Sequence, residues 1–202
     1  MAQEDKAKVL AAFGGHKGLL DAGVPSLVFL IAFNLDHKLN RAIIAAVISA
    51  GLLGVIRLLR RDTLRHIASG FFGVLICALF AAKSGNAVNF YLPKLITNLA
   101  YGSAYLLANL VGWPLLGIML GPILGENFEW RKDPARKKAY IRASWIWVGL
   151  FFGRIAVQYP LYRAGKVNLL GTVNLAMGYP LFLAAAWGSW LVIKNAPKLK
   201  VD

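Results

Sequence analysis

Six apolar runs, separated by short polar stretches, dominate the chain. A helix of about 20 predominantly apolar residues is long enough to cross a bilayer, and each run comes close to that length. The runs cover residues 19–35, 42–59, 67–82, 91–111, 141–159 and 167–193. The pattern therefore predicts an all-α polytopic membrane protein with six transmembrane helices, built as a single integral membrane domain over residues 1–202.

The apolar sequence after the fourth run continues to Leu124 and is too long for one helix. Trp113-Pro114 divides it, and the second piece holds only about a dozen residues, too few to cross ~30 Å of hydrocarbon as a helix. We therefore expect a short re-entrant or interfacial segment after the fourth helix. Glycines recur at a spacing of four in this segment and in the fifth run: Gly117, Gly121 and Gly125, then Gly149 and Gly153. This spacing serves either close helix packing or dimerisation.

Two further helix features are expected from single residues. Asp133 is a suitable N-cap for a helix with Pro134 in its first turn. Pro180 stands in the middle of the sixth run, where its ring should kink the helix.

The two halves of the chain share a short segment. "VPSLVFLIAF" around Pro25 and "LPKLITNLAY" around Pro93 carry proline, leucine, alanine and a final aromatic residue in the same frame. The segments open the first and fourth spans, which run in opposite directions. Either the chain holds a 3+3 inverted repeat, the arrangement that marks binding sites in many transporters, or two unrelated helices each have a proline in the first turn.

Polar residues follow one face of the fourth span along its whole length. The stripe consists of Lys94, Asn98, Gly102, Tyr105 and Asn109, with Tyr101 at its edge. Polar groups facing lipid are costly, so the stripe must face protein or water. It predicts either hydrogen bonds between helices or the wall of a polar cavity.

Arg154 lies deep in the fifth span, where an arginine needs a partner or an aqueous cavity. Gln158 lies one turn further along the same helix face. Three interpretations stay open for Arg154: an ion pair with Asp36, binding of a substrate anion or lipid phosphate, or extension to the outer interface. Arg154, Gln158 and four residues of the stripe form the candidate ligand-binding set: Lys94, Asn98, Tyr105, Asn109, Arg154 and Gln158.

The net charge of +14 reflects membrane topology. If the N-terminus is cytoplasmic, 16 of the 23 Lys and Arg residues fall in cytoplasmic segments, six fall on the opposite side, and Arg154 lies within a span. This bias predicts that both termini are cytoplasmic, in the cytoplasmic (inner) membrane. The cytoplasmic segments are residues 1–18, the basic loop 125–140 and the tail 194–202. Their basic residues should contact anionic lipid headgroups, and nucleic acid is not an expected partner.

Catalytic motifs are missing from the sequence. It has no HExxH, no GxSxG and no P-loop, and its three histidines fall in three separate polar segments. The single cysteine, Cys77, lies in an apolar run and is expected to be a small buried hydrophobe. The chain is therefore predicted to be no enzyme, with no catalytic residues, metal site or cofactor.

The sequence resembles a family of uncharacterised actinobacterial multi-pass membrane proteins. The resemblance rests on "GGHKGLLDAGVPSLVFLIAF", "VIRLLRRDTLRHIASGFFGVLICALFAAKSG" and "WPLLG", and covers nearly the whole chain. More distantly, "PLLGIMLG", "RASW" and "VNLLGTVN" follow an order similar to that of the inner-membrane septation protein A family. That likeness implies a six-helix protein linked to synthesis or division of the cell envelope, and it supplies no catalytic residues.

Two functions are compatible with these features. The first is a non-enzymatic envelope-associated protein that organises membrane-protein partners, copies of itself or lipid. The alternative is a small transporter or channel for a polar or anionic solute, with a polar cavity between the fourth, fifth and sixth helices. In a scaffold the polar residues should be paired inside a closed bundle, whereas in a transporter they should line a water-filled cavity.

Overall fold

The computed structural model describes residues 23–60 and 64–197, and all the regular elements in these residues are helices. The predicted N-terminal segment 1–18, the start of the first span and the last five residues of the tail lie outside the described residues. The all-helical fold that the apolar pattern predicts is confirmed for the described chain.

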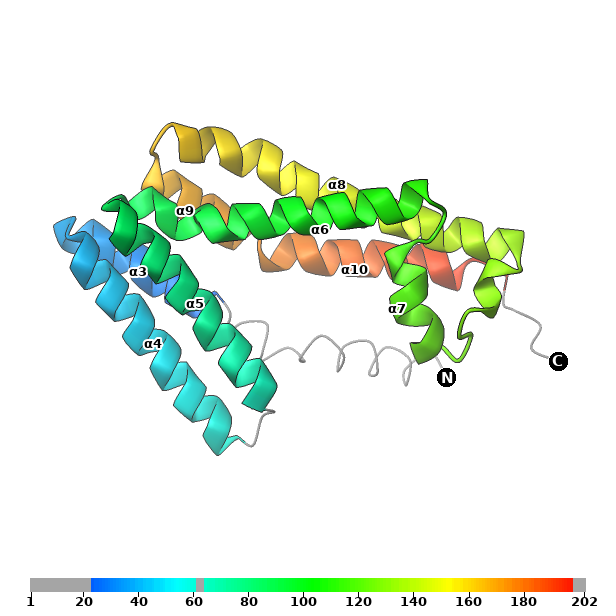
Figure 1. Cartoon of the computed structure of the whole chain (residues 1–202), viewed down its shortest axis with the longest axis horizontal. Coiled ribbons are helices and arrows are strands. Elements are labelled where there is room, and N and C mark those ends of the chain that lie inside the picture. Colours follow the sequence, from blue (N-terminus) through cyan, green and yellow to red (C-terminus); the bar gives the residue numbers. More distant parts are fainter. Residues whose placement is uncertain (1–22, 61–63, 198–202) are drawn as a thin grey trace. The chain divides into compact units, whose positions relative to one another are not determined.

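The described helices follow the predicted spans closely (Figure 1). They are α3 (Val24–Asp36), α4 (Leu39–Leu59), α5 (Leu64–Ser84), the 3-10 helix η1 (Ala87–Tyr91), α6 (Leu92–Leu110), α7 (Leu115–Ile123), the 3-10 helix η2 (Glu129–Arg131), α8 (Pro134–Arg163), α9 (Val167–Ala176) and α10 (Tyr179–Lys194). The predicted basic loop 125–140 is therefore a loop only in its first half, because α8 begins at Pro134.

Two predicted helix features are confirmed. The Asp133 carboxylate accepts hydrogen bonds from the backbone N–H groups of Ala135, at 2.8 Å, and Arg136, at 3.2 Å, so Asp133 caps α8. The sixth span is interrupted at Met177 and Gly178, between α9 and α10, and Pro180 is the second residue of α10.

Three helical stretches in the described residues are long and apolar enough to cross a membrane: Leu39–Leu59, Ile67–Ser84 and Val167–Lys194. A fourth is obtained if Ala87–Leu110 and Leu115–Ile123, bent by 86° at their junction, form one broken span. These helices fit a polytopic membrane protein. The other two predicted spans differ: α3 has 13 described residues, and α8 carries Arg142, Arg154 and Gln158 within its apolar run.

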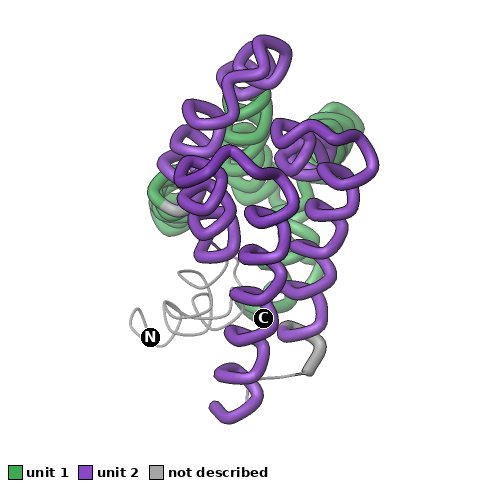
Figure 2. The backbone as a smooth tube through the Cα atoms, turned by 90° about the vertical axis from the view of Figure 1, so that its left-hand side faces the viewer, with its two compact units in different colours: residues 1–15, 98–155, 180–202 green, residues 16–97, 156–179 purple. Residues whose placement is uncertain are grey.

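The helices form two compact units, shown in different colours in Figure 2. Unit 1 contains residues 98–155 and 180–197 of the described chain, and unit 2 contains residues 23–60, 64–97 and 156–179. Each unit combines segments that are distant in sequence.

In unit 2, α3, α4 and α5 pack side by side (Figure 1). The packed face of α4 carries small residues, with Ala42, Ala46 and Ala50 buried. Large apolar residues such as Ile48 and Leu52 are more than half exposed. Alanines allow the helices to approach closely, and the large apolar side chains suit contact with lipid.

The core of unit 2 takes buried residues from α3, α4, α5, η1 and α9. The Phe29 ring of α3 stacks on the Phe90 ring of η1 with a centroid distance of 3.9 Å. A Cβ added to Gly171 of α9 would lie 2.6 Å from the Tyr91 hydroxyl oxygen and 2.8 Å from a Leu30 methyl group. The absence of a side chain at Gly171 therefore lets Tyr91 and Leu30 pack directly on α9.

In the core of unit 1, Trp147 of α8 contacts residues of α6 and α10. Its indole N–H donates to Ser189 Oγ of α10 at 2.9 Å, and its ring stacks on Tyr105 of α6 with a centroid distance of 5.8 Å. The Phe182 ring of α10 meets it edge-on at 5.0 Å. One side chain of α8 thus joins three helices of the unit.

The Trp130 side chain is fully buried and packs against the glycines of α7. A Cβ added to Gly117 would lie 2.8 Å from the Trp130 ring, and one added to Gly121 would lie 2.3 Å from the Asn127 carbonyl oxygen. Of the two roles that the spacing of four allowed, close packing thus accounts for these two glycines.

Candidate functional site

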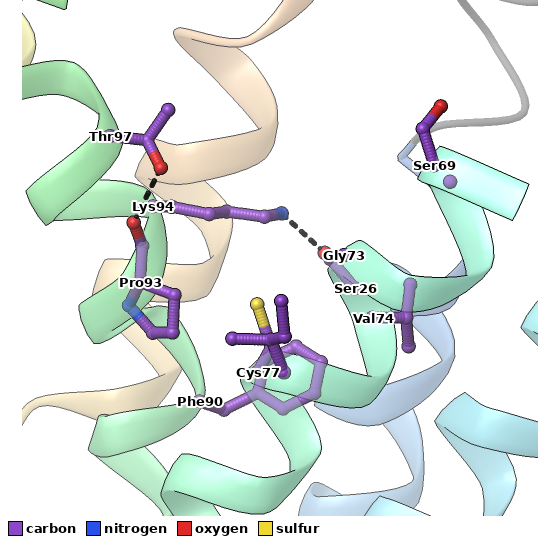
Figure 3. A pocket seen from close by; sticks show the side chains of 11 residues that line it. Ser26, Ser69, Gly73, Val74, Cys77, Phe90, Pro93, Lys94 and Thr97 are labelled. Atoms are coloured by element: carbon purple, nitrogen blue, oxygen red, sulfur yellow. Dashed lines mark hydrogen bonds between the residues drawn. The ribbon is translucent and has the colours of Figure 1, made fainter. Parts of the chain in front are cut away.

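Unit 2 has a partly open cavity of about 310 Å³ between α3, α5, η1 and α6 (Figure 3). Its polar lining residues are Ser26, Ser69, Lys94 and Thr97, and the remaining described lining residues are Gly70, Gly73, Val74, Ile76, Cys77, Phe90 and Pro93. The volume lies at the lower end of the range of about 300–1,000 Å³ that is typical of ligand sites. The cavity is thus large enough for a small molecule.

The chain between α5 and α6 places Lys94 at this cavity. Gly85 adopts a positive φ of 64°, which glycine tolerates, and ends α5. The Asn86 side chain then caps η1 by accepting the N–H of Val88 at 3.1 Å. Pro93 stands in the first turn of α6, where its missing N–H costs nothing, and Lys94 follows it.

Lys94 connects α6 to two other helices of unit 2. Its ammonium group donates to Ser26 Oγ of α3 at 2.6 Å, as Figure 3 shows, and to Asn174 Oδ1 of α9 at 3.3 Å. The Asn174 amide in turn donates to Gln158 Oε1 of α8 at 3.3 Å. Gln158 is 1% exposed. Four helices therefore contribute to one polar network that begins at the cavity wall.

Two of the six predicted binding residues, Lys94 and Gln158, belong to this network. Of the six, Lys94 alone is among the residues described as lining the cavity of unit 2. The prediction located a polar cavity between the fourth, fifth and sixth helices, whereas the described cavity lies at the first, third and fourth. The spacing of polar residues identifies a helix face, but it does not identify the helices that this face meets.

The rest of the polar stripe lies in unit 1 and is packed against neighbouring helices. The Asn109 amide donates to the Ile141 carbonyl oxygen of α8 at 3.3 Å. Tyr105 is 6% exposed, and its hydroxyl lies 4.0 Å from the Met119 sulfur. Asn98 is also buried, and a Cβ on Gly102 would lie 3.2 Å from the Phe151 and Phe152 side chains. These residues act as contacts between helices.

Arg154 belongs to unit 1, and its side chain is partly buried. Asp36, its predicted ion-pair partner, belongs to unit 2, where it binds Arg41 at 2.7 Å and accepts the N–H of Lys38 at 3.0 Å. The N–H of Lys38 and the charge of Arg41 hold the pKa of Asp36 below its ordinary value, although desolvation opposes them. Asp36 thus stabilises the turn between α3 and α4.

Sequence reasoning missed several residues of the cavity: Ser26, Ser69, Thr97 and Cys77. Single hydroxyl groups in apolar helices are common and give little signal. One signal was present, because Ser26 follows Pro25 as Lys94 follows Pro93. The two matched positions are in direct contact through the 2.6 Å hydrogen bond.

A second polar cluster lies in unit 1, where the predicted basic loop meets α8 and α10. Arg136 forms a bidentate ion pair with Glu126 and donates to the Ile193 carbonyl oxygen at 2.7 Å. The Tyr140 hydroxyl donates to Glu126 at 2.7 Å. Burial raises the pKa of Tyr140, and the carboxylate of Glu126 raises it further, so this hydroxyl stays protonated as a donor.

No three His, Cys, Asp or Glu side chains come together to form a metal site in the parts of the chain that the structure describes.

The long apolar helices and the polar network between them fit the class of polytopic helical membrane proteins. The chain belongs to the family described as protein of unknown function DUF3159, whose model matches residues 13–200. No curated protein and no solved structure matches it. The likeness to the septation protein A family and the actinobacterial affiliation stay predictions.

Proposed function

We propose that the chain is a non-enzymatic protein of the cytoplasmic membrane that binds a small polar or anionic solute in the cavity of unit 2. It would act as a small carrier or channel. The observation that supports this proposal best is the cavity of about 310 Å³ with the Lys94 ammonium group in its wall. The ammonium group is held between helices by Ser26 and Asn174, and a charge that is partly removed from water is costly, so its place at a cavity points to a binding role.

The helix arrangement around the cavity supports the same function. A five-residue 3-10 helix, η1, leads into α6 at the cavity. Interrupted helices that meet at a polar site are a common feature of secondary transporters. The contact between Ser26 and Lys94 joins equivalent positions of the two proline-marked segments, as expected near the axis of a 3+3 inverted repeat.

We propose six spans with both termini in the cytoplasm, with α7 as a re-entrant or interfacial segment. The distribution of Lys and Arg supports this topology. Basic residues of the loop and tail would contact anionic headgroups. A reporter that is active only in the cytoplasm, fused after residue 202, should be active; an inactive but expressed fusion would contradict the topology.

One observation favours the scaffold as a second candidate. The polar side chains of unit 1 are largely joined to neighbouring helices, as in the Trp147 to Ser189 hydrogen bond at 2.9 Å. A closed bundle of this kind suits a protein that organises envelope partners, lipid or further copies of itself. The septation-like sequence pattern points in the same direction.

Native mass spectrometry of the purified full chain separates the two candidates. The wild type is compared with Lys94→Met and with Lys83→Met, which removes an exposed lysine from the end of α5 as a control. A bound solute present in the wild type and in Lys83→Met, and lost from Lys94→Met, is expected. A wild type without any adduct, or an adduct retained in Lys94→Met, would contradict solute binding at this cavity and favour the scaffold.

A further inference from the structure

The wall of the unit 2 cavity has a polar part and an apolar part. Lys94, Ser26 and Thr97 form most of the polar part, on α3 and the first turns of α6, and Ser69 adds a hydroxyl group from α5. The Thr97 hydroxyl donates to the Pro93 carbonyl oxygen at 2.8 Å. Val74 and Phe90 contribute apolar surface from α5 and η1. A ligand that matches this wall needs a polar group at one end and an apolar body.

The polar part favours an anion with a single negative charge. Among the described residues that line the cavity, Lys94 is the charged one, and its charge is positive. Ser26 Oγ accepts a hydrogen bond from Lys94, so its own O–H can donate to another acceptor. An ammonium group and a hydroxyl donor side by side suit a carboxylate, since charge-assisted hydrogen bonds are about twice as strong as neutral ones.

We propose that the cavity binds a small organic carboxylate with an apolar body. The carboxylate would bind at Lys94 and Ser26, and the apolar body would pack against Val74 and Phe90. The volume of about 310 Å³ limits the ligand to a small molecule. This inference rests on the proposed function and specifies the chemical class of the solute.

The chain contains its own reporter for this site. Cys77 is the single cysteine of the sequence and lies in the cavity wall. Figure 3 shows its sulfur pointing into the space below the Lys94 side chain. A molecule bound at Lys94 should therefore slow alkylation of Cys77.

The experiment measures the rate at which N-ethylmaleimide alkylates the full-length protein in lipid nanodiscs. Three probes of similar size and different charge are compared: benzoate, benzyl alcohol and benzylammonium. We expect benzoate to slow the reaction at concentrations about tenfold lower than the other two. A control protein with Cys77→Ser and Lys83→Cys carries its thiol at the exposed end of α5, beyond the apolar run, and none of the probes should change its rate.

Lys94→Met tests the assigned residue. It removes the charge and keeps a side chain of similar length, so the benzoate concentration that gives half protection should rise about tenfold or more. Benzyl alcohol should then protect at least as well as benzoate, which also shows that the cavity is intact. Lys94→Arg keeps the charge and should keep the preference for benzoate.

The outcomes separate the inference from the proposed function. Equal protection by the three probes, stronger protection by benzylammonium, or a preference for benzoate that survives in Lys94→Met would overturn the carboxylate assignment alone. A Cys77 that reacts only after unfolding would overturn the accessible cavity, and both proposals with it.

Discussion

At the scale of single residues, the described lysines have different roles according to their surroundings. Lys94 donates to Ser26 and Asn174 inside unit 2, whereas Lys132 is 78% exposed and pairs with Glu129 at the surface. Exposed pairs are worth little, because water screens the charges and the side chains lose freedom. A charge inside the helix bundle is costly, and its position is therefore more informative about function.

The ion pair between Arg136 and Glu126 should stabilise unit 1 strongly. The Arg136 side chain is 6% exposed and that of Glu126 is 11% exposed. Arg136→Met would leave the carboxylate buried with the Tyr140 hydroxyl, at a cost of about 3 kcal/mol in the free energy of unfolding. Unfolding of the purified protein by SDS in mixed micelles measures this loss.

Lys132→Met is the matched control for this variant. It removes a cation whose pair with Glu129 is largely exposed, so the free energy of unfolding should change by at most about 1 kcal/mol. Equal effects of the two substitutions would show that the buried pair is not a specific support of the unit.

At the scale of elements, most helices could be predicted and most of their contacts could not. The apolar runs correctly predicted α4, α5 and α6, because the length and composition of a membrane helix are evident in its own sequence. Trp113-Pro114 correctly predicted the break before α7. The cavity depends instead on how α3, α5 and α6 meet, and this is determined by residues that are distant in the sequence.

The glycines illustrate the same limit. Their spacing is similar in α7 and α8, yet Trp130 packs on the glycines of α7, while a Cβ added to Gly149 or Gly153 would meet nothing within 4 Å. A shared spacing therefore corresponds to two different environments, and sequence alone does not distinguish them.

Gly121→Ala should destabilise the protein by about 1–3 kcal/mol, because the new methyl group would lie 2.3 Å from the Asn127 carbonyl oxygen. Gly149→Ala serves as the control and should be neutral or stabilising by up to about 1 kcal/mol. Unfolding in SDS gives both values. Loss of a dimer in Gly149→Ala, seen by size-exclusion chromatography with light scattering, would instead assign the second glycine pair to dimerisation.

In the molecule as a whole, the polar stripe of α6 changes its role along the helix. Lys94 of the stripe lines the cavity of unit 2, together with Thr97 beside the stripe, whereas Tyr105 and Asn109 are packed inside unit 1. The sequence predicted one continuous stripe with one role. Both alternatives that it left open, cavity wall and interhelical hydrogen bonds, occur on the same helix.

The most direct test of this claim is the reaction of single cysteines with a water-soluble methanethiosulfonate reagent in membrane vesicles. Thr97→Cys and Asn109→Cys are compared in a Cys77→Ser background, and Leu99→Cys serves as an exposed control on the same helix. We predict a fast reaction at residue 97 and protection at residue 109. Residue 99 should stay unreactive, because lipid excludes water from it. Protection at residue 97, or a reaction at residue 109 as fast as at residue 97, would contradict the claim.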